Sequence, residues 1–355
     1  MALTTAVIIP PRQKKRPPSK ALPAISIIIP FRNEQHSLWE LLLSLSRQTY
    51  RGTWEVILVN DRSTDDFLPV IERFRRSYPH ISVRLQDSNF TDTIGLTGKQ
   101  QALEAGVKTA RYDWLAFTDA DVQVAAHWLE SLSSRIRTGA EFVYGHTAII
   151  AQTGDLFAQF QKFQLRLLFC TALAFSRAQL TGSCMGNNLC ISKHLYQKIG
   201  GQAGIGYSIV EDRELMKHAR LRGKSAVPTL PFLPTVFTYP EKTAASFYAQ
   251  AGRWVLGGLT GSRLLLVVML MLALQNITFV GTLTGLHGPL RILPKINAAL
   301  LWGFCLVSFA RTGKIIQALF FPVFYISMII ESMILSIGIL ISRRICWKGE
   351  VLKTT

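Results

Sequence analysis

The chain has 355 residues, enough for one or two domains with a full hydrophobic core. Its 39 lysines and arginines outnumber 22 acidic residues, and the net charge of +17 favours an anionic partner such as nucleic acid, a membrane surface or an anionic substrate. The basic residues form no recognition helix or zinc finger, so we expect no nucleic-acid partner.

From Ile25 onward, strand-like and helix-like segments alternate. Residues 1–22 read as a basic, proline-rich disordered tail without the apolar run of a signal peptide. Short β-branched or apolar runs predict strands at 25–30, 54–59, 82–85 and 114–118. Apolar residues at helical spacing predict helices at 38–48, 67–78 and 99–110. This order predicts an α/β fold with a mostly parallel sheet and helices on both faces.

After residue 142 the strand signal weakens. Leu156, Phe160, Phe163 and Leu167 recur at helical spacing, so residues 155–178 are expected to form one amphipathic helix. Packing of this helix against the core and contact with a membrane surface both fit the pattern. A glycine-rich region follows, and it allows close approach to a ligand.

Polar residues follow the predicted strands. Asn33 and Glu34 come after the first strand, Asp61 after the second, and Asp119 and Asp121 after the fourth. Ligands of parallel sheets bind at the carboxyl ends of the strands. A D-x-D at such an end predicts a Mg²⁺ or Mn²⁺ site on a diphosphate, because these cations prefer carboxylate and phosphate oxygens.

A second acidic pair, Glu211 and Asp212, precedes the predicted helix 213–222. Such a pair complements a helix dipole, or supplies a general base that removes a proton from an attacking hydroxyl. On the second interpretation we assign the base to Asp212.

The last quarter of the chain is the most apolar. Residues 264–286 and 319–341 are long enough to span a membrane, and 296–310 lies near the lower limit. The sequence therefore predicts two or three transmembrane segments. Basic residues on both sides of this region place the flanking parts in the cytoplasm.

Taken in their order along the chain, these motifs resemble those of glycosyltransferase family 2. The resemblance is strongest to its membrane-anchored branch, which includes ceramide-glucosyltransferase-like and carotenoid or hopanoid glycosyltransferases. The similarity runs from about Ile25 to Gly349. The matching segments are Ile27 to Glu34, Val59 to Asp65, Gly98-Lys99 with Ala102-Leu103, Thr118 to Asp121, Gly186 to Asn188, Glu211-Asp212, Gln250 to Trp254, and Trp347 to Gly349.

The resemblance implies a GT-A fold, Rossmann-like in its sheet, followed by a C-terminal transmembrane helical region. It implies an inverting, metal-dependent hexosyltransferase that moves a sugar from a nucleotide-diphosphate sugar to a membrane-lipid-type acceptor. The implied catalytic residues are Asp212 and Glu211, and the implied metal ligands for Mg²⁺ or Mn²⁺ are Asp119 and Asp121. The implied donor-binding residues are Pro30, Asn33, Glu34, Asp61, Lys99, Asp119, Gln250, Arg253 and Trp254. Gly186, Asn187 and Asn188 would form the acceptor loop.

The resulting domain boundaries are 1–22 for the tail, 23–240 for the transferase domain and 241–263 for an interfacial segment. They continue with 264–342 for the transmembrane region and 343–355 for a basic cytoplasmic tail. The expected location is the cell membrane, multi-pass, with the catalytic domain on the cytoplasmic side and membrane lipids as neighbours.

Two departures from the family pattern stand out, and neither involves the expected metal ligands or base. Asn60 replaces the first aspartate of the V-D-D turn, and Val210 stands where threonine often precedes the E-D pair. A processive polysaccharide synthase and a catalytically inactive membrane scaffold remain as alternatives. The sugar, the acceptor and the oligomeric state are not fixed by the sequence.

Overall fold

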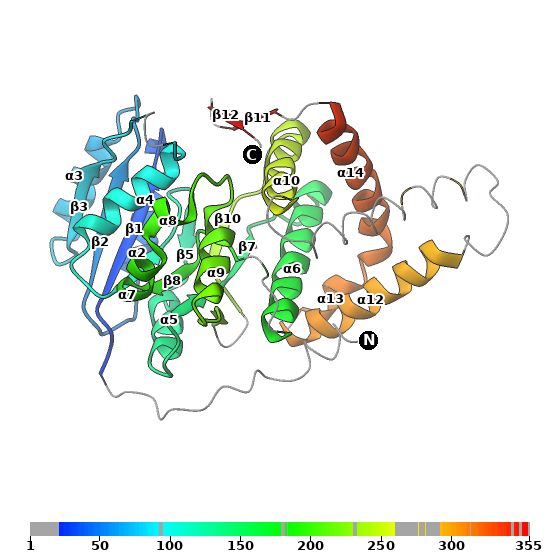
Figure 1. Ribbon diagram of the computed structural model, residues 1–355, viewed down its shortest axis with the longest axis horizontal. Helices are drawn as coiled ribbons and strands as arrows, with labels where there is room; N and C mark the ends of the chain where they lie inside the picture. The colour runs from blue at the N-terminus through cyan, green and yellow to red at the C-terminus, as the bar shows by residue number, and fades with distance from the viewer. Residues whose placement is uncertain are drawn as a thin grey trace. The chain divides into compact units, whose positions relative to one another are not determined.

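The computed structural model describes residues 21–91, 95–178, 182, 184–229, 233–259, 276, 281, 292–312, 314–341, 344–347 and 350–353. The chain divides after Pro240 into two compact units. We call them the N-terminal unit and the C-terminal unit and describe each by itself (Figure 1).

The N-terminal unit is built on a seven-stranded sheet with the order β3-β2-β1-β4-β8-β6-β9. Its parallel half consists of β1 (Ile25–Phe31), β2 (Trp54–Asn60), β3 (Val83–Asp87) and β4 (Trp114–Phe117). All seven residues of β1 are buried, as expected for a central strand covered on both faces. The predicted strands and the mostly parallel α/β sheet are therefore confirmed in this half of the unit.

The other half of this sheet is mixed, and none of its strands is predicted from the sequence. β8 (Leu189–Ser192) runs antiparallel to both β4 and β6 (Phe142–Tyr144), and β9 (Val227–Pro228) runs parallel to β6. A separate three-stranded sheet consists of β5 (Val122–Val124), β10 (Pro234–Thr238) and β7 (His146–Ile149).

Helices cover both faces of the large sheet. This is seen in β1, whose alternate residues belong to two different hydrophobic clusters. Ile25, Ile27 and Ile29 pack with α2 (Gln35–Ser46), α3 (Leu68–Ser77) and α5 (Trp128–Ile136). Ile28 packs in the cluster that includes α4 (Gly98–Thr109), α7 (Lys193–Ile199), α9 (Glu211–Leu221) and part of α6 (Leu156–Arg177). The short α8 (Gly201–Ile205) precedes α9.

The C-terminal unit is mainly helical. Its elements are α10 (Ala244–Leu259), α12 (Leu293–Arg311), α13 (Ile315–Ala318), α14 (Phe321–Ile341) and the hairpin of β11 (Arg344–Trp347) and β12 (Glu350–Lys353). Asn276 and Ser332 exchange side-chain hydrogen bonds in this unit, and Glu331 of α14 is buried.

One expectation for the C-terminal unit is corrected. Among the described residues, no helix has both the length and the apolar run that a membrane span requires. The apolar run counted from Leu319 is divided, because Leu319 and Phe320 form a turn before α14 begins and Glu331 lies near its middle. The transmembrane region of the expected fold class and the multi-pass location with a cytoplasmic catalytic domain are therefore not supported. The predicted span at 264–286 lies outside the described residues except for Asn276 and Gly281.

Candidate active site

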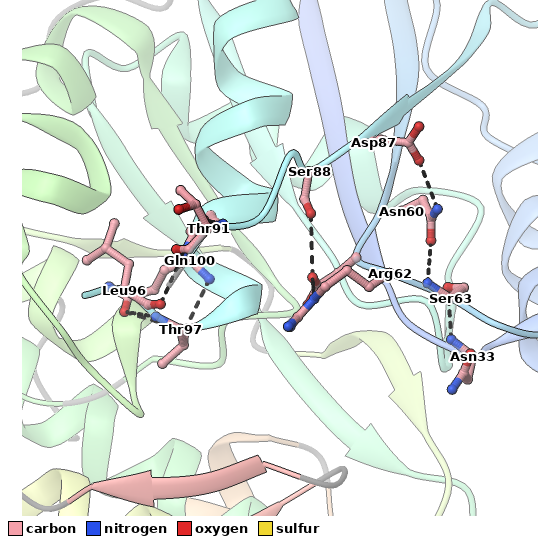
Figure 2. A network of polar contacts seen from close by, with 12 residues as sticks. Asn33, Asn60, Arg62, Ser63, Asp87, Ser88, Thr91, Leu96, Thr97 and Gln100 are labelled. Atoms are coloured by element: carbon pink, nitrogen blue, oxygen red, sulfur yellow. Dashed lines mark hydrogen bonds and ion pairs between the residues drawn. The ribbon is translucent and has the colours of Figure 1, made fainter. Parts of the chain in front are cut away.

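The carboxyl ends of β1, β2 and β3 are joined by a network of side-chain hydrogen bonds (Figure 2). Asn60, the last residue of β2, donates from its amide to Asp87 Oδ1 at 2.8 Å and accepts from the Ser63 backbone N–H at 2.9 Å. The Asn33 backbone N–H donates to Ser63 Oγ at 3.0 Å. An aspartate at position 60 would have no N–H to donate to Asp87 and would face it with a like charge. The asparagine is therefore suited to this network.

Asp61 lies beside this network and is 6% exposed. Its Oδ1 accepts from Arg62 Nε at 2.9 Å and from Ser88 Oγ at 3.5 Å. The Arg62 guanidinium lies 3.5 Å from the centre of the Phe90 ring, a cation–π geometry. Gly98, at the start of α4, allows the close approach of both Asp61 and Arg62, because a Cβ there would collide with their side chains. The result is a fixed carboxylate next to a helix N-terminus.

The start of α4 is itself firmly held. Thr97 and Gln100 form a capping box, in which the Thr97 hydroxyl accepts from the Gln100 N–H. The Gln100 amide also donates to the Gly206 carbonyl at 2.8 Å and lies 3.3 Å from Gln202 Oε1. These contacts connect α4 to the loop before α9 and so fix the position from which Lys99 extends.

Lys99 connects the two acidic motifs. Its Nζ lies 2.9 Å from Asp119 Oδ1 and 3.0 Å from Glu211 Oε1. Asp119 follows β4, whereas Glu211 is the first residue of α9, so the pairs join residues that are far apart in sequence. The sheet order brings these charges together.

These residues line a shallow pocket that opens to solvent. Five predicted site residues take part in its wall: Lys99, Asp119, Gly186, Glu211 and Asp212. Its remaining lining residues are Leu103, Phe117, Thr118, Leu189, Gln202 and Leu215. The pocket thus combines an apolar floor with a few converging charged groups, as is typical of small-molecule sites.

Asp212 is the second residue of α9. Its Oδ1 accepts from the Arg213 backbone N–H at 2.7 Å, and Gly186 packs so closely that an added Cβ would lie 3.2 Å from Oδ2. The nearby Cys184 thiol lies 3.6 Å from the Asp212 carbonyl oxygen. Burial raises the pKa of Cys184 well above its ordinary value of 9.0, and the charges of Asp212 and Glu211 raise it further. The thiol therefore stays protonated beside Asp212.

The predicted acceptor loop is anchored by its two asparagines. Asn188 is fully buried; its Oδ1 accepts from Trp128 Nε1 at 3.0 Å, and its amide donates to the His146 carbonyl and Thr235 Oγ1, both at 3.1 Å. Asn187 Oδ1 accepts from Thr147 Oγ1 at 2.8 Å. In this structure both asparagines fix the loop, while Gly186 reaches the pocket wall.

The donor set at the end of β4 fits a divalent cation that is held mainly by its substrate. Asp119 lies in the pocket wall, with its Oδ1 2.9 Å from Lys99 Nζ, and Asp121 follows two residues later without lining the pocket. Both carry carboxylate oxygens, the ligands that Mg²⁺ and Mn²⁺ prefer. The adjacent Thr118 hydroxyl is buried and has no hydrogen-bond partner among the described residues. Within the described part of the chain, no cluster of three or more His, Cys, Asp or Glu side chains is placed to hold a metal. Two carboxylates suit Mg²⁺ or Mn²⁺ on a diphosphate and do not suit a closed structural site.

The other predicted site residues lie outside the pocket wall. Pro30 is buried in β1 opposite Val59. Asn33 has a φ of 56° and accepts from the Thr64 N–H at 2.7 Å. Glu34 precedes α2 and accepts from the Ser37 hydroxyl at 2.6 Å.

Gln250, Arg253 and Trp254 belong to the C-terminal unit. They lie on α10, where their i, i+3 and i+4 spacing puts them on one side of the helix. Gln250 donates to Glu241 Oε1 at 3.0 Å within the same unit.

Sequence reasoning missed Arg62, Ser88 and Gln202. Arg62 could have been considered, because it stands inside the matched turn, directly after Asp61. Ser88 and Gln202 carry no local signal, since they reach their partners only through the strand order and the packing of α4 against α8.

Comparisons with known proteins relate the chain to glycosyltransferases. The family model described as glycosyl transferase family 2 matches residues 26–200. Glycosyltransferase AglE of Haloferax volcanii is 27% identical over 143 residues, 40% of this chain and 45% of that protein. The beta-monoglucosyldiacylglycerol synthase of Nostoc sp. is 25% identical over 252 residues, 70% of this chain and 52% of that protein. The chain thus spans about half the length of these relatives.

Among solved structures, the mannosyltransferase PcManGT from Pyrobaculum calidifontis, in complex with GDP-Man and Mn²⁺, superposes with a TM-score of 0.56. The two chains are 17% identical, and the likeness covers 95% of this chain and 92% of that one. This likeness concerns the fold and agrees with the expected GT-A architecture. Residues 26–200 are therefore identified as a glycosyl transferase family 2 domain.

Proposed function

We propose that this chain is an inverting glycosyltransferase that moves a sugar from a nucleotide-diphosphate sugar to a lipid-type acceptor. The observation that carries the proposal is the meeting of Lys99, Asp119, Glu211 and Asp212 around one pocket at the carboxyl ends of the strands. Parallel sheets bind ligands at this edge. A diphosphate needs positive charge, and an attacking hydroxyl needs a base; the pocket offers both.

In this proposal Asp61 accepts a hydrogen bond from the nucleotide base, and Lys99 contacts the diphosphate. Asp119 and Asp121 would hold Mg²⁺ or Mn²⁺, and such a cation would supply positive charge to offset the negative charge of the leaving diphosphate. Asp212 takes the proton from the acceptor hydroxyl while the hydroxyl oxygen bonds to the sugar carbon and the bond to the diphosphate breaks. One displacement inverts the configuration and requires no covalent enzyme intermediate.

The lipid character of the acceptor rests on two observations. Similarity to a beta-monoglucosyldiacylglycerol synthase extends over 70% of the chain. On α6, Leu156 is 72% exposed, and Phe157 and Leu168 are also exposed, so apolar side chains are accessible on this helix. Phe160 and Phe163 are buried, and the predicted amphipathic helix therefore faces the core with those two rings.

The proposal is tested by incubating the purified full chain with radiolabelled UDP- and GDP-sugars and a bacterial lipid extract. We expect labelled glycolipid whose anomeric configuration, read by NMR, is opposite to that of the donor. Asp212→Asn is nearly isosteric but cannot accept the proton, so the rate should fall by about two to four orders of magnitude while donor binding persists.

The matched control is Glu211→Gln, which changes the neighbouring carboxylate. A full rate in Asp212→Asn together with a lost rate in Glu211→Gln would assign the base to Glu211. A ladder of water-soluble products of increasing length would instead favour a processive polysaccharide synthase. A wild-type chain that consumes none of the donors would contradict the proposal.

A further inference from the structure

The Lys99 ammonium contacts Asp119, the carboxylate that we propose as a metal ligand. Its Nζ lies 2.9 Å from Asp119 Oδ1 and, at the same time, 3.0 Å from Glu211 Oε1. The Glu211 side chain is only 11% exposed, whereas those of Lys99 and Asp119 are 34% and 31% exposed. The ammonium is therefore attached to one nearly buried carboxylate and one accessible carboxylate.

The Lys99 ammonium and a divalent cation bound to Asp119 would compete with each other. Both would be held by the Asp119 carboxylate, and both are positive, so a metal bound there would be repelled by an ammonium a few ångströms away. The positive N-terminal end of α4, where Lys99 is the second residue, strengthens this repulsion. A lysine side chain has a flexible four-carbon stem, so Lys99 can leave one partner while it keeps the other.

We propose that Lys99 is an internal competitor of the divalent cation: it occupies Asp119 in the free protein and moves to the diphosphate when the nucleotide binds. The inference rests on the proposed function, because it assumes that a metal and a diphosphate share this pocket. Glu211 then has a role separate from that of Asp212. It holds the Lys99 ammonium in the pocket while the metal takes Asp119, and we class Glu211 as a positioning residue.

This exchange makes metal and nucleotide binding interdependent. Without nucleotide, a metal must displace Lys99 from Asp119 and binds weakly. With nucleotide, the diphosphate offers Lys99 a new anionic partner and offers the metal additional oxygen ligands. Since coupling between two ligands is reciprocal, each should strengthen the binding of the other by the same factor.

The test measures Mn²⁺ binding and needs no turnover. The affinity of the full chain for Mn²⁺ is determined by electron paramagnetic resonance, without nucleotide and with saturating UDP or GDP. In Lys99→Gln we expect Mn²⁺ alone to bind roughly tenfold more tightly than in the wild type. We also expect the factor by which nucleotide improves Mn²⁺ affinity to shrink by a similar amount.

Lys99→Arg is the matched control, because it keeps the charge and should keep the wild-type coupling. Lys99→Met repeats the neutral substitution with a side chain of similar length, in case the glutamine variant does not fold; circular dichroism checks both. Equal or weaker Mn²⁺ binding in a folded neutral variant, with coupling as in the wild type, would overturn the inference. Turnover of the wild type with unchanged Mn²⁺ binding in Lys99→Gln contradicts this inference alone. Tighter Mn²⁺ binding in Lys99→Gln with no wild-type turnover contradicts the proposed function alone.

Discussion

Gly98→Ala tests whether Asp61 contacts the nucleotide base without altering any charged group. A Cβ at position 98 would lie 2.5 Å from Arg62 Nη2 and 3.2 Å from Asp61 Cγ, and closer still to Asp61 Oδ2. Carbon contacts are most favourable at about 3.5 Å or more, so the guanidinium must retreat by roughly 1 Å. Arg62 is long and can move. Asp61 is short, 6% exposed and held through its backbone N–H by the Phe31 carbonyl, so its carboxylate must rotate instead.

Rotation of the Asp61 carboxylate removes the hydrogen bond proposed for the nucleotide base. A hydrogen bond to a charged group contributes about 1.5–3 kcal/mol, which corresponds to a loss of affinity of about 10- to 150-fold. Isothermal titration calorimetry with UDP and GDP measures this change. Thermal unfolding should move little, because the collision involves partly exposed polar groups and not the hydrophobic core.

Gly106→Ala is the control on the same helix. Its Cβ would lie 2.5 Å from Ile28 Cγ2 and 3.0 Å from Val59 Cγ2, inside the core. Overpacking there should lower the free energy of unfolding by about 1–3 kcal/mol, partly offset by about 1 kcal/mol of helix propensity, and leave nucleotide affinity unchanged. If Gly98→Ala binds nucleotide like the wild type, or still weakens binding in an Asp61→Ala background, the reasoning on Asp61 is refuted.

Three further predictions concern the metal, the loop and the pH dependence of stability. Excess chelator and Asp121→Ala should each abolish turnover, with Mn²⁺ or Mg²⁺ restoring only the chelated wild type; full activity in chelator would contradict the metal assignment. Asn188→Ala leaves buried groups such as Trp128 Nε1 without their partner, and should lower the free energy of unfolding in urea by about 1–3 kcal/mol or more. Burial and then the charge of Glu104 raise the pKa of Tyr196 well above 10.0, so its contribution to stability is present below pH 10 and lost as pH rises above it. Between pH 9 and 11 the melting temperature of Tyr196→Phe should therefore fall less steeply than that of the wild type.

The parallel half of the sheet could be predicted because each of its strands can be recognised from its own residues, without knowledge of its partner. β1 and β2 are largely apolar runs, interrupted only by Ser26 and Glu55 near their starts, and each is followed by a helix with one apolar face. Such runs have few alternatives to a buried parallel strand. Because parallel strands end at the same edge of the sheet, the polar residues that follow β2 and β4 are predicted to lie at one site, and these residues include Asp61 and Asp119.

The mixed half of the large sheet and the separate three-stranded sheet could not be predicted in the same way. β6 and β7 have only three and four residues, too few for a periodic pattern, and β7 is completed by β10 almost ninety residues later. The amphipathic pattern of α6, by contrast, extends over 22 residues and was correctly interpreted as one helix. Local patterns thus predict the helices and strands whose hydrophobic periodicity can be read within their own residues. They miss short strands that form only by pairing with distant segments.

The same distinction applies to the site. Each acidic motif could be recognised in the sequence, but their proximity could not be predicted. That proximity depends on Lys99 contacting both Asp119 and Glu211. The strand order puts β4 beside β1, and α4 packs on β1 and β2, so the first turn of α4 lies near the end of β4. α8 packs on both α4 and α9 and so holds the start of α9, with Glu211, near the start of α4, with Lys99. An acidic pair at a helix start is compatible with a simple dipole effect; the ammonium held between Glu211 and Asp119 is what argues for a functional role.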